Sequence, residues 1–157
     1  MRKIYLFILL CISLQLRAQG IKPYPSNFNP DSLKLAAAAP KTWQGKIVAF
    51  EGVINEKYKA QGGHRYLLVG LPGTESIWVG TIVNDDPKII YEGAHIKVLG
   101  YFDLVDDKKA QELNKTGYHV LAIAIVNLET KQITSHEAAK QQVDEWKKGK
   151  VPKAQVE

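Results

Sequence analysis

Cysteine is nearly absent from this chain of 157 residues, because Cys11 is its one example. A single cysteine excludes an intramolecular disulfide and the repeated cysteine pairs of structural zinc sites. Arginine is also scarce, and after loss of the amino terminus only Arg65 would remain. No serine lies in a Gly-x-Ser-x-Gly motif, which argues against a hydrolase of that type. These absences favour a binding protein over an enzyme.

The amino terminus carries a positive segment and then an apolar one. Met1-Arg2-Lys3 precedes nine mostly apolar residues, Ile4 to Ile12. That run is shorter than the ~20 residues that span a bilayer, and the pattern is typical of a secretion signal. We therefore expect residues 1–18 to be a signal peptide that is cleaved near Ala18.

Export sets the expected location of the protein and the fate of its cysteine. The mature protein is expected to be periplasmic or secreted, with no transmembrane segment after processing. Cys11 would leave with the signal peptide. A lipid anchor on Cys11 is disfavoured because the bulky Leu10 stands where lipoproteins carry a small residue.

The charge of the chain is less basic than its full composition suggests. The formal net charge is +5. Loss of residues 1–18 takes Arg2, Lys3 and Arg17 and no acid, which leaves 18 basic residues, 16 acidic residues and a net charge of +2. A nearly neutral protein lacks a general attraction for phosphate backbones. We therefore expect an unknown protein or small ligand as partner, while nucleic acid is an option that charge does not support.

Five β-rich segments at close spacing predict an all-β core. Residues 19–42 before them are predicted to form an extended leader and a short helix through 33–39, with Asp31 or Ser32 as its N-cap. Residues 106–116 are predicted to be a charged loop. The expected strands are residues 46–54, 65–71, 76–83, 92–103 and 118–128.

The fifth segment is apolar at odd and even positions, so both of its faces must be covered. Two candidate covers are the helix through 33–39 and a C-terminal helix within residues 131–157, and in the latter Ala139, Val143 and Trp146 recur at helical spacing. Ser135 is its predicted N-cap, and the end of the chain is expected to be a frayed tail.

Glycines inside the strands predict how the sheet curves. Gly52 interrupts the first strand and Gly100 the fourth, as at the bulges and bends of small barrels. We therefore predict an all-β fold with flanking helices. Its centre is a five-stranded OB-fold Greek-key barrel over residues 43–130, with a short N-terminal helix and a C-terminal helix.

Three segments carry a resemblance to a known group of proteins. Residues 45–54 and 92–100 resemble the first and fourth strands of OB domains. Together with Ile77-Trp78-Val79-Gly80 and the secretion signal, they make the chain similar to bacterial periplasmic OB-fold proteins over about residues 43–129. The resemblance implies a helix before the barrel rather than between its third and fourth strands. It implies no particular ligand, since this fold serves many functions.

Neither the histidines nor the carboxylates form a metal-binding motif. His95 and His119 are expected about seven positions apart along paired strands, or roughly 20 Å, whereas zinc ligands lie within a few ångströms of one ion. Asp85-Asp86 and the acids of 103–107 lack the spacing of a calcium loop and are interpreted as solvated turns. We expect no metal, no cofactor and no enzymatic activity.

The residues best suited to bind a ligand lie around the predicted loop 55–63 and the strands beside it. OB domains bind across their second and third strands, between the first and last loops, and aromatic side chains there stack on bases or sugars. The predicted ligand-binding residues are Lys57, Tyr58, Lys59, His64, Arg65, Trp78 and Tyr101.

The strand pattern does not say whether Trp78 faces the core or the solvent, because Trp78 alternates with the apolar Ile77 and Val79. The function expected from the sequence is an exported, non-catalytic binding or interaction module of unknown ligand. The alternative is a secreted OB-fold protein that binds nucleic acid or oligosaccharide.

Overall fold

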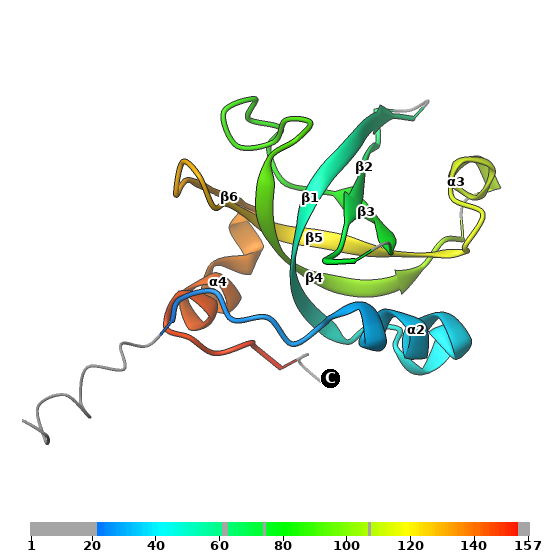
Figure 1. Cartoon of the computed structure of the whole chain (residues 1–157), viewed down its shortest axis with the longest axis horizontal. Coiled ribbons are helices and arrows are strands. Elements are labelled where there is room, and N and C mark those ends of the chain that lie inside the picture. Colours follow the sequence, from blue (N-terminus) through cyan, green and yellow to red (C-terminus); the bar gives the residue numbers. More distant parts are fainter. Residues whose placement is uncertain (1–21, 61–62, 74, 107, 154–157) are drawn as a thin grey trace, which may run out of the picture.

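The computed structural model describes residues 22–60, 63–73, 75–106 and 108–153. One strongly curved sheet forms a barrel with helices around it (Figure 1), which confirms the predicted fold class. The sheet order is β3-β2-β1-β4-β5-β6, and a parallel pairing of β3 with β5 closes the barrel. The strands are β1 (Ile47–Lys59), β2 (Arg65–Gly70), β3 (Ser76–Thr81), β4 (His95–Leu104), β5 (Tyr118–Asn127) and β6 (Ile133–Ser135).

Two glycines allow backbones to approach closely where the sheet bends. A Cβ atom on Gly52 would lie 2.5 Å from the carbonyl oxygen of Gly70, and one on Gly100 would overlap the carbonyl oxygen of Leu121. The pairing of β4 with β5 also shifts its register between Leu99 and Gly100. Ile123 is the extra residue at this shift, so the bulge belongs to β5 and bends that strand beside Gly100. The predicted role of these glycines agrees with this geometry.

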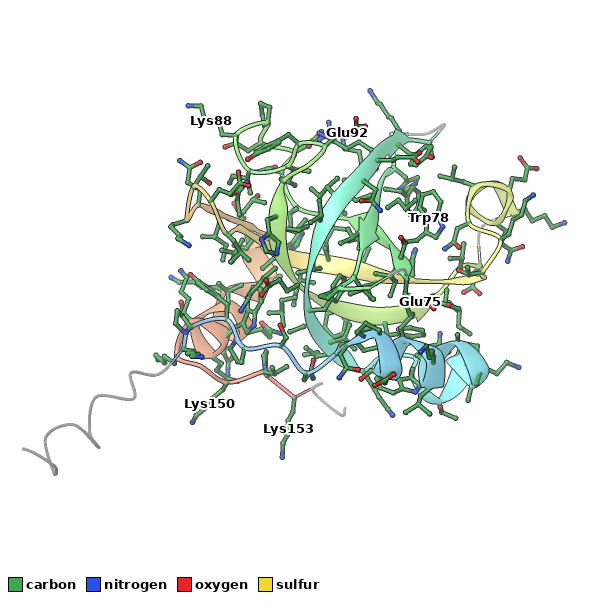
Figure 2. All side chains as sticks on the ribbon, in the orientation of Figure 1. Glu75, Trp78, Lys88, Glu92, Lys150 and Lys153 are labelled. Carbon is green, nitrogen blue, oxygen red and sulfur yellow. The ribbon has the colours of Figure 1, made fainter. Side chains whose placement is uncertain are left out.

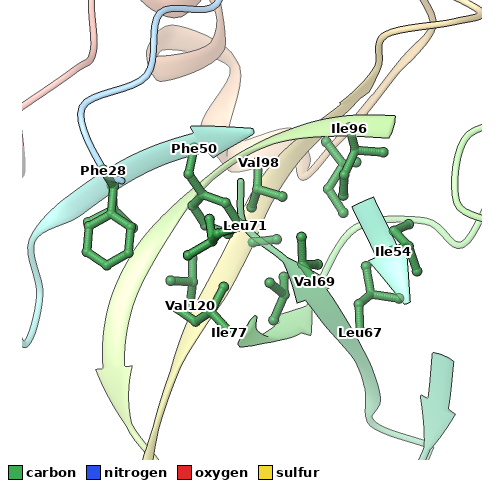
Figure 3. Packing of buried hydrophobic residues seen from close by; sticks show 14 of the residues in the cluster. Phe28, Phe50, Ile54, Leu67, Val69, Leu71, Ile77, Ile96, Val98 and Val120 are labelled. Carbon is green, nitrogen blue, oxygen red and sulfur yellow. The ribbon is translucent and has the colours of Figure 1, made fainter. Parts of the chain in front are cut away.

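The barrel interior is filled by apolar side chains from all five strands of the barrel. Figure 3 shows Phe28 at one end of this packed row and Ile54 with Leu67 at the other. Phe28 belongs to the leader, not to a strand. Its ring centroid lies 5.5 Å from that of Trp43, 6.0 Å from Phe50 and 6.4 Å from Phe102. The leader thus closes one end of the barrel with an aromatic cluster.

A second apolar cluster lies outside the barrel, over β1, β4 and β5. It contains Ile123 and Val126 of β5, whereas Val120 and Ile125 of the same strand face the interior. Both faces of β5 are therefore covered, as its sequence predicted. The cover is α4 (Lys140–Lys147), with Val143 and Trp146 4% and 0% exposed.

The leader is tied to this helix and to the barrel by hydrogen bonds. The indole Nε1 of Trp146 donates to the carbonyl oxygen of Pro25 at 2.9 Å. The side-chain oxygen of Asn27 accepts from the backbone N–H of Ala49 at 2.7 Å. The extended leader therefore lies along the barrel and joins its two clusters.

The N-terminal helix α2 (Pro30–Ala38) begins earlier than its sequence predicted. Asn29 is its N-cap, and the Asn29 Oδ1 accepts from the backbone N–H of Ser32 at 2.8 Å. The prediction of Asp31 or Ser32 as N-cap was wrong, because proline fits the first helical position and moves the cap to the residue before it. A short 3₁₀ helix, η1 (Pro40–Thr42), follows α2.

The C-terminal region also differs from expectation. Ser135 is not an N-cap but the last residue of β6, which pairs with β5 beyond the point where β3 ends. The cap of the following 3₁₀ turn, η2 (Glu137–Ala139), is His136, whose Nδ1 accepts from the N–H of Ala138 at 3.3 Å. The predicted loop between β4 and β5 contains the short helix α3 (Lys108–Leu113).

Candidate binding face at one end of the barrel

A bulge in β1 decides which side chains of this strand face outward. The pairing of β1 with β2 shifts between Ile54 and Glu56. Before the shift, the inward-facing Ile54 lies opposite the inward-facing Val69; after it, Lys57 lies opposite the inward-facing Leu67. Because a shift by one residue exchanges the two faces of a strand, Lys57 is directed to the barrel end and Tyr58 to the outer surface.

Trp78 of β3 is directed away from the core. Its neighbours Ile77 and Val79 are 1% and 0% exposed, whereas Trp78 is half-buried. Figure 2 shows Trp78 on the side of the barrel away from α4. The Trp78 ring centroid lies 5.1 Å from that of Tyr58, at an interplanar angle of 49°. The ambiguity of the strand pattern is thereby resolved in favour of the outer surface.

Two more rings extend this surface across the strands. Tyr66 lies opposite Tyr58 in the pairing of β1 with β2, and its ring centroid is 6.0 Å from that of His119 on β5. Gly80 lies beneath them, where a Cβ atom would be 3.4 Å from the Tyr66 ring and 3.5 Å from the His119 Nδ1. We call the four residues Tyr58, Tyr66, Trp78 and His119 the aromatic face.

His119 contributes a neutral ring to the aromatic face at neutral pH. Burial lowers the pKa of His119 below its usual 6.5, and the negative charge of Asp103 opposes this shift in part. Within the described part of the chain, the His119 Nδ1 is buried and has no hydrogen-bond partner. An uncharged imidazole presents a flat, weakly polar ring beside Tyr66.

Tyr58 is held in place by its own strand. Its hydroxyl donates a hydrogen bond to the carboxylate of Glu56, and this bond is the largest cause of the raised pKa of Tyr58. Glu56 and Tyr58 are both outward-facing after the bulge. This hydrogen bond and the contact with Trp78 place the Tyr58 ring on the outer surface of the sheet.

Charged side chains line the end of the barrel next to the aromatic face. The Lys57 ammonium lies 3.0 Å from Asp85 Oδ1 and donates to the carbonyl oxygen of Ile90 at 2.9 Å. The Arg65 guanidinium lies 3.4 Å from Asp85 Oδ2. These groups surround a cavity of about 260 Å³. We call this cavity and its lining residues Lys57, Lys59, Arg65, Thr81, Asp85 and Ile90 the polar end.

The structure brings together most of the predicted ligand-binding residues. Lys57, Tyr58, Lys59 and Arg65 line the cavity, and Trp78 contacts Tyr58. His64 is exposed in the connection between β1 and β2. Tyr101 does not join them, because it packs against the second apolar cluster beneath α4.

Several members of the site were not predicted, among them Thr81 and Ile90 of the polar end. Tyr66 and His119 belong to the aromatic face, and Asp85 is the carboxylate shared by two cations. Strand alternation places Tyr66 on the face opposite to Leu67, which was a usable signal. His119 reaches the face only through the parallel closure of β3 on β5. The interpretation of Asp85 as a solvated turn residue was wrong, because its side chain is only 24% exposed and paired with both cations.

The aromatic face and the polar end bring together rings, hydrogen-bond donors and charged groups. In the described ranges, no three His, Cys, Asp or Glu side chains are grouped in a way that would hold a metal ion. No described helix is both long and apolar enough to cross a membrane. No protein-family model matches the chain, and a search of curated proteins found no relative. Stacking, hydrogen bonding and charge pairing are the interactions that its side chains offer.

Proposed function

We propose that this protein is an exported, non-catalytic binding module that takes a ring-bearing ligand on its aromatic face. The observation that carries the proposal is the outward direction of Trp78 in contact with Tyr58. A tryptophan side chain stabilises a protein more when it is buried in the core than when it lies on the surface. Its outward position, within a group of other rings, favours a ligand contact.

The surroundings of the aromatic face support this assignment. The rings come from four strands, β1, β2, β3 and β5, and the rigid sheet fixes their spacing. Because the rings are held before a ligand arrives, little side-chain entropy is lost on binding. Sugar rings and nucleobases both stack on such surfaces. Export is the sequence-based part of the proposal and rests on residues 1–18, which lie outside the described ranges.

The proposal is tested by binding of the full-length processed protein to an array of immobilised oligosaccharides. We expect the parent to bind a subset and the Trp78→Ala variant to bind that subset about 1–3 kcal/mol more weakly, the usual contribution of one stacked aromatic. Leu35→Ala is the matched control, since Leu35 is 65% exposed on α2, away from the site. Equal binding by the parent and Trp78→Ala, or no binding to any member, would contradict the proposal.

A single-stranded nucleic acid is the second candidate ligand. Lys57, Lys59 and Arg65 lie beside the aromatic face, and bases stack on aromatic side chains while cations follow the phosphates. The acids Glu56, Asp85 and Glu92 lie in the same region and limit this attraction. Binding to an oligothymidylate that weakens steeply between low and high salt would favour this candidate.

The expected export is tested separately from binding. Mass spectrometry of the protein recovered from producing cells should show an amino terminus close to Gln19. A mass that retains Met1 would contradict export by a cleaved signal, and it would leave the assignment of the aromatic face unaffected.

A further inference from the structure

Among the residues that line the polar end, three cations (Lys57, Lys59 and Arg65) accompany the one carboxylate of Asp85, while Glu56 and Glu92 lie beside this lining. Lys57 and Arg65 share the single carboxylate of Asp85. Lys59 lies directly opposite Arg65 in the pairing of β1 with β2. Among the described residues Lys59 takes part in no ion pair. Like charges directly opposite one another on paired strands repel, and the ion pair of Arg65 with Asp85 offsets this repulsion.

The Arg65 guanidinium has more hydrogen-bond donors than its ion pair with Asp85 uses. One nitrogen of its guanidinium faces Asp85, whereas the group carries five N–H donors in a planar fork that fits phosphate and carboxylate oxygens. The Thr81 hydroxyl lines the same cavity and is a further donor. The Lys57 ammonium is already fixed by Asp85 and by the carbonyl of Ile90. These donors therefore stand in position around an empty volume.

The size of the cavity decides what part of a ligand it can hold. Its volume of about 260 Å³ is just below the ~300–1,000 Å³ of pockets that enclose drug-sized molecules. The cavity is therefore suited to a charged head group rather than to a whole ligand. Tyr58 and Tyr66 line it and also belong to the aromatic face. The two sites are continuous through these rings.

We propose that the polar end is an oxyanion site, which receives the phosphate or carboxylate group of a small ligand whose ring lies on the aromatic face. Lys59 and Arg65 bind the anion, Thr81 donates to it, and Lys57 supplies fixed positive charge. Asp85 orients Lys57 and Arg65 and weakens the attraction for the anion. The combined ligand class, a sugar phosphate or a sugar acid, rests on the proposed function; the oxyanion site alone does not.

The oxyanion site is tested with inorganic phosphate alone, which needs no ring contact. Saturable shifts of the Arg65 and Thr81 amide resonances are expected on titration at constant ionic strength. Arg65→Gln should weaken phosphate binding at least about tenfold, since a hydrogen bond to a charged group is lost. Lys41→Gln makes the same change in charge on η1, outside the site, and should bind phosphate like the parent.

A variant that is expected to strengthen phosphate binding distinguishes a binding role of these charged residues from a purely structural one. Asp85→Asn removes the competing carboxylate and should strengthen phosphate binding several-fold, whereas loss of a structural ion pair would weaken it or leave it unchanged. No saturable phosphate binding, or equal binding by the parent and Arg65→Gln, would overturn the oxyanion site. Weakened binding in Asp85→Asn would overturn the role given to Asp85.

Glucose 6-phosphate, glucuronate and glucose then distinguish the sources of the anion. The two charged sugars should bind more tightly than glucose and than inorganic phosphate, and Trp78→Ala should remove only the gain over inorganic phosphate. If the charged sugars bind no more tightly than inorganic phosphate, the proposal of a sugar phosphate or sugar acid whose ring lies on the aromatic face would be overturned. The oxyanion site itself would be unaffected by that result. An oligothymidylate bound far more tightly than either sugar would overturn the small-ligand class.

Discussion

The two ends of the barrel are closed in different ways. At one end, Phe28 of the leader is 3% exposed and packs against the rings of Trp43, Phe50 and Phe102. At the other end, the interior stops at Ile54 and Leu67 (Figure 3), and the side chain beyond them is Lys57, which is 31% exposed. One end excludes water with aromatic carbon, and the other leaves a cavity whose lining includes four charged side chains.

This difference indicates which end of the barrel stabilises the fold. Burying apolar area is the main favourable term in folding, so the apolar end contributes much of the stability. Half-exposed ion pairs contribute little, because solvent screens them and their desolvation opposes the attraction. The polar end is thus a poor way to stabilise a barrel. The proposed oxyanion site gives these charged groups and the cavity a role.

The largest expected effect is at the apolar end. Phe28→Ala removes a buried ring and leaves a cavity among Trp43, Phe50 and Phe102, so it should lower the free energy of unfolding by about 3–5 kcal/mol. Chemical denaturation measures this. Leu35→Ala, on the exposed side of α2, should change the same quantity by less than about 0.5 kcal/mol. A variant Phe28→Ala as stable as the parent would show that the leader does not close the barrel.

A smaller effect is expected at the polar end. Lys57→Met removes the donor to the Ile90 carbonyl and one partner of Asp85, but keeps the aliphatic bulk over Leu67. The loss should be about 1–2 kcal/mol, because the side chain is partly exposed and Arg65 still faces Asp85. A loss equal to that of Phe28→Ala would mean that both ends carry the same share of the stability.

The aromatic face should contribute less again to stability. Trp78 lies on the outer surface of the sheet, where cross-strand contacts are worth roughly 0.2–1 kcal/mol each. Trp78→Ala should therefore lower the free energy of unfolding by about 1 kcal/mol or less while it weakens ligand binding. A loss near that of Phe28→Ala would place Trp78 among the core residues and end its assignment as a ligand contact.

The smallest expected effect is a dependence of stability on pH. Because the pKa of His119 is lowered in the folded protein, the unfolded chain takes up this proton at a higher pH. The contribution of His119 to stability is constant above its usual pKa of 6.5, and stability is lost as the pH falls from there through the folded value. The melting temperature of the parent should therefore fall more than that of His119→Phe between about pH 8 and about pH 5. Equal losses in the two proteins would contradict the shift.

Local pattern was sufficient to predict most of the strands. The five predicted strands overlap β1 to β5 because alternation, β-branched residues and flanking turn residues act within a few positions. Gly100 also indicated a bend, because a glycine inside a strand is typical of bends and bulges, and the structure shows that a side chain there would meet the backbone of Leu121. The cover over β5 could also be predicted, because adjacent residues such as Ile125 and Val126 are both apolar and lie on opposite faces of the strand, where neither can remain in water.

The candidate site was only partly predictable. The strand pattern allowed either direction for Trp78, because both sets of alternating side chains contained apolar residues. Tyr101 is an aromatic residue of the kind that binds ligands, but it packs against the second apolar cluster, to which α4 contributes. The spacing of residues along β4 does not reveal this contact. His119 meets Tyr66 across a contact between strands that are far apart in the chain.

The sequence by itself determined the barrel, its glycine bends and the apolar spacing that places Val143 and Trp146 against it, because these follow from interactions between near neighbours and from the need to bury carbon. The tertiary structure alone decided which side chains share the site. The bulge between Ile54 and Glu56 turns Lys57 to the barrel end and Tyr58 outward, and the closure of β3 on β5 brings His119 beside Tyr66. A register shift of one residue exchanges the faces of a strand. The position of this shift depends on how the whole barrel packs and not on the identity of the residues whose faces are exchanged.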